Sequence, residues 1–123
     1  MKITFLGTGT SQGIPIIGCK CKVCKSANPK DKRLRSSVMI ETQGKRFVID
    51  TSPDFRQQML KEKVNRLDAA VYTHEHRDHI AGLDDVRAFN FIMKKKMDLY
   101  ASKRVQQSVR KQFDYVFEGK KYP

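Results

Sequence analysis

All three histidines of this 123-residue chain stand in one short segment, residues 73–79, which reads THEHRDH. The apolar residues 67–72 directly before it are typical of a short buried strand. Because alternate side chains of a strand point the same way, we expect His74 and His76 to converge on one metal ion where the strand ends. A buried strand that runs straight into a metal-binding loop constrains the fold more than any other feature of the sequence.

The alternative explanation is a solvated loop that happens to hold the three histidines. Histidine is scarce in this chain, and such a concentration of imidazoles indicates metal binding or proton transfer. We expect Asp78 and His79 to turn toward a second ion and to act in catalysis. A carboxylate suits Zn or Mn, whereas an exposed pair of Asp78 with Arg77 would contribute little. Glu75 and Arg77 occupy the positions that alternate with the histidines, so we expect their side chains to face away from the ions.

The segment 74–79 resembles the His-x-His-x-Asp-His signature of the metallo-beta-lactamase superfamily. Other segments resemble one branch of that superfamily, the phosphodiesterases similar to the cyclic-phosphate hydrolase of bacterial phosphonate breakdown. Together they cover most of residues 1–92. These segments are 7–15 (GTGTSQGIP), the trio Cys19, Cys21 and Cys24, 33–37 (RLRSS), 49–56 (IDTSPDFR) and 82–87 (GLDDVR).

The resemblance implies an α/β fold, a sandwich of two sheets with helices on the outer faces (αββα). Residues 1–123 would form the N-terminal half of it, as a single incomplete domain. The superfamily supplies a third histidine for each ion and a bridging aspartate from its second half, and no histidine follows His79 here. The chain is therefore interpreted as an N-terminal fragment, inactive by itself.

The same resemblance implies a role for each matching residue of the metal site. His74 and His76 would bind the first ion, and Asp78 and His79 the second. Asp50, at the end of its own strand, would not bind an ion itself but would fix the orientation of these ligands.

The cysteines Cys19, Cys21 and Cys24 allow three interpretations: a metal knuckle, a redox pair with a spare thiol, or ordinary small residues. An odd number of cysteines and the lack of a signal peptide argue against disulfides and suit a cytoplasmic protein. Three thiolates on one loop provide most of a tetrahedral structural Zn site. Nearby lysines would lower the pKa of these thiols. In the resembled branch, a distant histidine completes the site.

The rest of the sequence predicts alternating strands and helices. A strand is expected over 1–6, a hairpin over 37–49 that turns at Gln43-Gly44, and a strand over 99–101. A helix is expected to start at Ser52 as N-cap with Pro53 at its first position, and to reach about Lys63. After the histidines, the apolar positions of one helical face are Ile80, Leu83, Val86, Ala88 and Phe91. A last helix is expected with Val105, Val109, Phe113, and Val116 or Phe117 on one side. The first sheet is expected to have an apolar face that the second half would cover, which includes Val38, Ile40, Val48 and Val71.

The formal net charge of +12, from 25 Lys and Arg against 13 Asp and Glu, favours anionic partners. A small phosphodiester substrate fits, and RNA is the weaker alternative because no basic stretch interleaved with aromatic residues is present. No membrane partner is expected, and an oligomer is compatible with the sequence. The candidate substrate contacts are five polar residues, Arg35, Ser36, Asp54, Arg56 and Arg87. Arginine suits a phosphodiester because its planar guanidinium group can bind two oxygens at once.

These features predict a metal-dependent hydrolase, a phosphodiesterase that uses a hydroxide bridged between two divalent ions, Zn or Mn. No side-chain nucleophile is then required. One alternative is an RNA-processing nuclease of the same superfamily. Another is a non-catalytic zinc-binding interaction module in which the histidines only complete a structural site. The number of ions per chain distinguishes the enzyme, with up to three, from the module, with one.

Overall fold

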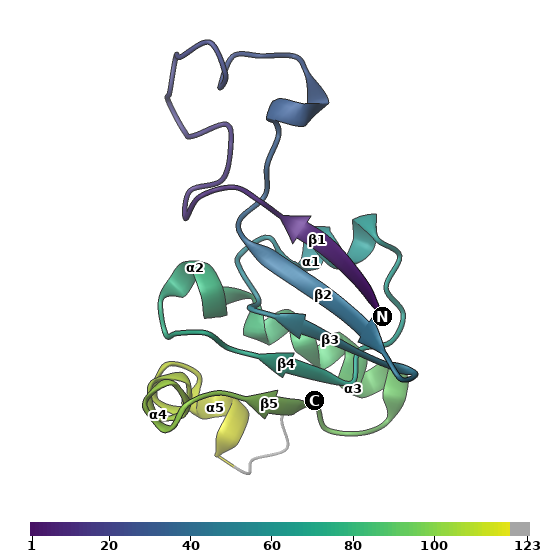
Figure 1. The fold of residues 1–123 in the computed structure, drawn as a ribbon. Coiled ribbons are helices and arrows are strands. Elements are labelled where there is room, and N and C mark those ends of the chain that lie inside the picture. Colours follow the sequence, from purple (N-terminus) through teal and green to yellow (C-terminus); the bar gives the residue numbers. More distant parts are fainter. Residues whose placement is uncertain (119–123) are drawn as a thin grey trace.

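The computed structural model describes residues 1–118, which form one five-stranded mixed sheet with helices against one face (Figure 1). The strands lie side by side in sequence order. The pairs β1–β2 and β2–β3 are antiparallel, and β3–β4 and β4–β5 are parallel. The mixed α/β class expected from the sequence is confirmed. The strands are β1 (Lys2–Gly7), β2 (Ser37–Thr42), β3 (Lys45–Ile49), β4 (Ala69–Val71) and β5 (Asp98–Tyr100).

The β2–β3 hairpin turns through Gln43 and Gly44, whose φ angles are 49° and 70°. A two-residue turn with both residues in the left-handed region matches the right-handed twist of the strands it joins. The resulting register sets Val38 opposite Ile49. The predicted hairpin is confirmed.

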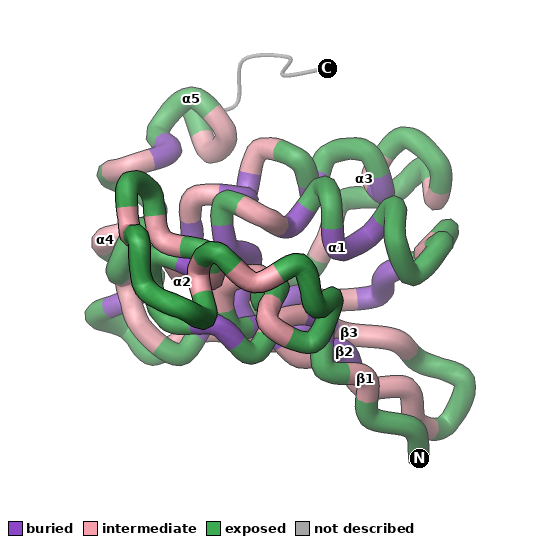
Figure 2. Tube along the Cα trace, turned by 90° about the horizontal axis from the view of Figure 1, so that it is seen from above, coloured by how far each residue is buried: buried purple, intermediate pink, exposed green. Residues whose placement is uncertain are grey.

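Helices α1 and α3 lie behind the sheet in Figure 1, while α4 and α5 lie beside β5. Most of the buried chain in Figure 2 lies between the sheet and these helices. Phe55 of α1 meets Phe89 of α3 edge to face, with ring centroids 6.3 Å apart. Within residues 1–118, no helix has the length and apolar character to cross a membrane. The helices are η1 (Pro29–Asp31), α1 (Phe55–Lys61), α2 (Arg77–Ile80), η2 (Ala81–Val86), α3 (Arg87–Met93), α4 (Lys103–Gln112) and α5 (Asp114–Phe117).

The two faces of the sheet differ sharply in exposure. On the covered face, the cross-strand neighbours Met39, Val48 and Ala70 are at most 4% exposed. On the other side, which we call the open face, Phe5 is 70% and Tyr100 57% exposed. The open face consists of two cross-strand rows, Ile3, Ile40, Phe47, Ala69 and Asp98, and Phe5, Val38, Ile49, Val71 and Tyr100.

The sequence prediction for this face is right for Val38, Ile40 and Val71 and wrong for Val48. Successive residues of a strand point to opposite faces, so Val48, which follows Phe47 of the open face, must point into the helical layer. It is fully buried there.

The segment after the histidines is not the single α-helix that was predicted. A 3-10 helix, η2, separates α2 from α3, and the large apolar residues buried along this segment recur every third position: Ile80, Leu83, Val86 and Phe89. Because a 3-10 helix has three residues per turn, it shifts the buried face relative to a 3.6-residue repeat. The predicted core positions Ala88 and Phe91 are therefore exposed, Phe91 by 59%.

Helix α1 starts later and ends earlier than predicted. Ser52 forms a turn, because its hydroxyl accepts the Asp54 N–H at 3.1 Å and its carbonyl accepts the Phe55 N–H at 3.0 Å. The helix begins at Phe55 and ends at Lys61. Lys63, the predicted end, has a φ of 52° and lies beyond the helix.

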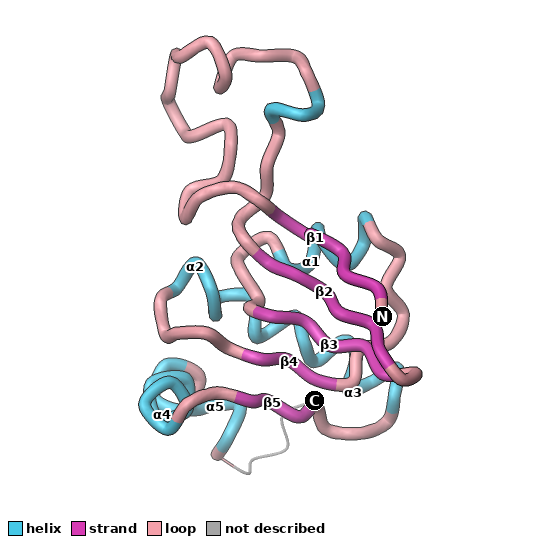
Figure 3. Tube along the Cα trace, viewed as in Figure 1, coloured by secondary structure: helices cyan, strands magenta, loops and turns pink. Residues whose placement is uncertain are grey.

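Residues 8–36, which we call the cysteine lobe, project from the sheet between β1 and β2, and η1 is the only helix in this loop (Figure 3). Backbone hydrogen bonds fasten its base. The Gly9 N–H donates to the Leu34 carbonyl at 2.7 Å. Ile14 and Arg33 exchange two bonds of 2.7 and 2.9 Å.

Candidate metal centre

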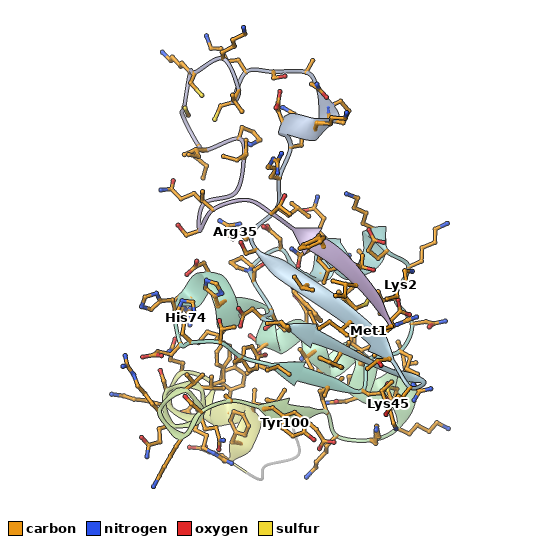
Figure 4. All side chains as sticks on the ribbon, viewed as in Figure 1. Met1, Lys2, Arg35, Lys45, His74 and Tyr100 are labelled. Carbon is orange, nitrogen blue, oxygen red and sulfur yellow. The ribbon has the colours of Figure 1, made fainter. Side chains whose placement is uncertain are left out.

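The histidine segment follows β4 at the end of the sheet opposite the β2–β3 turn, as the positions of His74 and Lys45 show (Figure 4). Strand β3 is parallel to β4 and ends at the same edge, where it leads into Asp50. The Asp50 N–H continues the pairing by donating to the Val71 carbonyl at 2.8 Å. Parallel pairing therefore brings Asp50 beneath the histidine segment.

The Asp50 carboxylate organises this segment. It is 5% exposed, and its residue has a left-handed φ of 63°, which is uncommon outside glycine. One oxygen, Oδ1, accepts the Thr73 N–H at 2.9 Å. The other, Oδ2, lies 2.7 Å from both the Thr73 hydroxyl and His79 Nδ1. These contacts fix the start and the end of the segment to the same buried group.

The contact with Asp50 assigns the proton of His79 to Nδ1 and leaves Nε2 as the ligand atom. His79 Nε2 lies 3.2 Å from Asp78 Oδ2. The predicted pair for the second ion therefore presents a nitrogen and an oxygen side by side.

The other two imidazoles lie at the same edge. The ring of His74 is 4.7 Å from that of His76 and 3.9 Å from that of His79, between centroids. The Thr73 hydroxyl lies 3.0 Å from His74 Nδ1. Nitrogen ligands next to a carboxylate suit Zn or Mn, so the donor set fits the expected ions.

Ion pairs and hydrogen bonds that the sequence did not reveal join the segment to α4. Glu75 Oε1 accepts from Arg104 Nε at 2.8 Å and Nη2 at 2.6 Å, and Arg77 donates to Gln112 at 3.3 Å. The Glu75 backbone N–H, followed by Arg104, lowers the pKa of the Glu75 carboxyl. Glu75 and Arg77 thus face away from the ligand positions, as their phase predicts.

The cysteine lobe holds the second candidate metal site. The Sγ atoms of Cys19, Cys21 and Cys24 all lie within 4.8 Å of one another, the only three-ligand group this close within residues 1–118. The thiols are free. The Cys24 N–H donates to Cys21 Sγ at 3.4 Å, and the Ile16 N–H donates to Cys24 Sγ at 3.4 Å. The bond from Cys24, followed by contacts with the Cys19 and Cys24 thiols, lowers the pKa of Cys21 to about 7, which favours a metal-binding thiolate.

Two of the candidate substrate contacts pair with each other. Arg35 Nη1 lies 3.0 Å from Asp54 Oδ1, and the Arg35 N–H donates to Asp54 Oδ2 at 2.8 Å. Arg35 Nε also donates to the Ser11 carbonyl at 2.7 Å, and Ser36 Oγ donates to the Gly9 carbonyl at 2.9 Å. In the structure, these residues fasten the base of the cysteine lobe to the turn before α1.

The remaining two candidates, Arg56 and Arg87, are exposed residues of α1 and α3. A substrate role for any of the five residues stays a prediction.

Comparison with known proteins identifies the family. The model of the beta-lactamase superfamily domain matches residues 45–123. The chain belongs to this superfamily. Its structure matches the N-terminal part of the metallo-beta-lactamase fold, as the histidine signature predicted.

Among solved structures, a diphosphatase of the PhnP family is 49% identical, with a TM-score of 0.89 over 94% of this chain and 47% of its own. Zn(2+)-bound PqqB from Methylobacterium extorquens is 27% identical, with a TM-score of 0.76 over 90% of this chain and 40% of its own. A Porphyromonas gingivalis protein named octanoyltransferase is 47% identical over 100% of this chain and 25% of its own length. The chain thus spans less than half of each of these relatives.

Proposed function

We propose that the intact protein is a metal-dependent hydrolase that cleaves phosphodiesters with two divalent ions, Zn or Mn. His74 and His76 would hold one ion, and Asp78 and His79 the other. Two such ions supply an activated water and neutralise charge on the phosphate. The 49% identity to a diphosphatase supports a substrate that carries phosphate groups.

The observation that carries the proposal is the buried Asp50 carboxylate and its contact with His79. A carboxylate on one ring nitrogen is the usual support of a metal-bound histidine, because it fixes the ring and raises the basicity of the other nitrogen. The same carboxylate also anchors the Thr73 backbone, so the His79 ring is held in a fixed position beside the His74 ring.

The remaining residues of the site position these ligands and the substrate. Thr73 stands between the carboxylate and the His74 ring, and the Glu75–Arg104 pair holds the outer side of the segment. The proposed substrate contacts are Arg35, Ser36, Asp54, Arg56 and Arg87.

The test is hydrolysis of an aryl phosphodiester by the intact protein after removal of metal and addition of Zn or Mn. We expect activity to return only with metal, at about two ions per site beyond any zinc in the cysteine lobe. Unchanged activity in the metal-free protein would exclude the mechanism.

We further propose that Cys19, Cys21 and Cys24 hold a structural Zn. Three thiolates leave one position of a tetrahedral ion to another ligand. If the protein were instead a non-catalytic zinc module, it would hold one Zn in the lobe and none at the histidines. Metal analysis of the Cys21→Ser and His76→Ala proteins separates the two sites.

The 123-residue chain alone is expected to be catalytically inert and to bind metal weakly at residues 74–79, because each proposed ion has two protein ligands here. Its open face is also expected to drive dimerisation or aggregation, since an apolar surface of this kind is rarely left bare. Light scattering and a phosphodiesterase assay test both expectations. A stable, fully active monomer would contradict them.

A further inference from the structure

The outer side of α3 exposes two large apolar residues that neither the core nor the metal centre uses. Phe91 is 59% and Ile92 61% exposed. Their neighbours Phe89, 4% exposed, and Met93, which packs against the core cluster, hold the other side of the helix inward. Because the inner side of α3 is fixed in this way, Phe91 and Ile92 are left in contact with solvent by the part of the chain that the structure describes.

Three consecutive lysines, Lys94–Lys96, follow this apolar pair directly, and all three are exposed. The helix ends at Lys94, which has a left-handed φ of 52°. The Lys94 N–H donates to the Phe91 carbonyl at 3.4 Å and the Lys95 N–H to the Asn90 carbonyl at 3.2 Å. This tight turn keeps the lysines against the last turn of the helix, beside Phe91 and Ile92.

We propose that this lysine–apolar patch, formed by Phe91, Ile92 and Lys94–Lys96, docks the protein onto an anionic lipid surface. Lysine side chains are attracted to anionic headgroups, and an exposed aromatic and aliphatic pair enters the boundary between headgroups and acyl chains. The charge is complementary, since no acidic residue lies between Asp85 and Asp98 and the whole chain carries a net charge of +12.

A lipid surface suits the patch better than a nucleic acid does. Phosphate-backbone contacts would use the lysines, and a base can stack on an aromatic ring, but neither uses an exposed aliphatic side chain such as Ile92. Docking on a surface also needs no spanning helix. The proposal departs from the expectation of no membrane partner.

The test is co-sedimentation of the intact protein with phosphatidylcholine vesicles, with or without about a third phosphatidylserine. We expect binding only to the anionic vesicles. Replacing Lys94, Lys95 and Lys96 together with Gln should lower partitioning on the order of 100-fold. The double change Phe91→Ser and Ile92→Ser should lower it about tenfold or more, while circular dichroism stays unchanged because both side chains are exposed.

The matched control replaces the exposed lysines Lys30, Lys103 and Lys111 with Gln, the same change in net charge elsewhere on the surface. It should change binding only a few-fold. An equal loss in this control would show attraction by overall charge and would overturn the proposal. Binding that ignores phosphatidylserine, or no binding at all, would overturn it too. If the Phe91→Ser, Ile92→Ser protein bound the anionic vesicles as well as the wild type does, the patch would be a general contact for polyanions and the lipid proposal would be overturned.

Discussion

The histidine segment and the cysteine lobe both gather metal-ligand side chains, but different parts of the fold hold them. The cysteines approach one another through a local loop, with bonds that span three to eight residues, outside the core. The histidines depend on Asp50, a buried residue that directly follows strand β3 and lies 29 positions from His79. The geometry of the lobe is thus local, whereas that of the histidine segment is a property of the whole sheet.

Loss of a ligand at the histidine segment should have the largest effect. In the intact protein, His74→Ala, His76→Ala and Asp78→Ala should each remove metal and activity together, because each proposed ion has two ligands on this segment. The fold should survive, since these side chains line an accessible edge. Metal analysis and turnover test the prediction. A His76→Ala protein with wild-type metal content and turnover would refute the assignment.

Removal of the buried support should have the next largest effect. Asp50→Asn keeps the shape of the side chain, and asparagine tolerates a left-handed φ, but the change removes the negative charge facing His79. We expect metal affinity to fall about 10- to 100-fold. Asp50→Ala also leaves the Thr73 N–H without its acceptor and should lower the free energy of unfolding by about 2 to 4 kcal/mol.

Asp68→Asn is the matched control for Asp50. Asp68 is also a buried carboxylate, 8% exposed, and it accepts the Arg46 N–H at 2.9 Å away from the metal edge. This variant should lose stability and keep its metal affinity. If Asp50→Asn and Asp68→Asn lowered metal affinity equally, Asp50 would have only a structural role.

A change in the lobe should have a smaller, local effect. Cys21→Ser should remove the lobe zinc and leave the free energy of unfolding of the sheet within about 0.5 kcal/mol, measured on the metal-free proteins. Mass spectrometry of protein purified without oxidants should show three free thiols once zinc is removed. A Cys21–Cys24 disulfide in such a sample would contradict the zinc assignment.

The smallest expected effect distinguishes the cysteines within the lobe. In the metal-free protein, alkylation of Cys21 should increase as the pH rises through about 7, where its thiolate forms. The Cys24 pKa is raised: the Ile16 N–H lowers it, but burial and the neighbouring thiols outweigh that bond, so Cys24 should react only at higher pH. Zinc affinity of the lobe should weaken as the pH falls below 7. Equal alkylation profiles for the two thiols would show that the lobe does not differentiate them.

The sequence predicted the parts of the fold that depend on local pattern. Strand alternation placed His74 and His76 together, and the Gln43-Gly44 signal located the hairpin. It could not predict the pairs Arg35–Asp54 and Glu75–Arg104, which join residues 19 and 29 positions apart. Those partners are set by tertiary packing and leave no periodic signal.

The local errors have physical causes as well. Serine is a common N-cap residue, but the Ser52 hydroxyl accepts the backbone N–H of Asp54, two residues later, and forms a turn. Phe91 fits a 3.6-residue repeat, which the 3-10 helix η2 interrupts. A cap and a turn use the same residue types, so the sequence pattern alone does not distinguish them.

The turn at Gln43 and Gly44 has a consequence for the opposite end of the sheet. It sets the register of β3 against β2, and a slip of one residue would exchange the faces of every following side chain in the strand. Ile49 would then take the place of Asp50 beneath His79, and the histidine segment would have an aliphatic side chain where it needs a carboxylate. Folding fidelity at a solvent-exposed turn, far from any ligand, thus decides whether the metal edge is assembled at all.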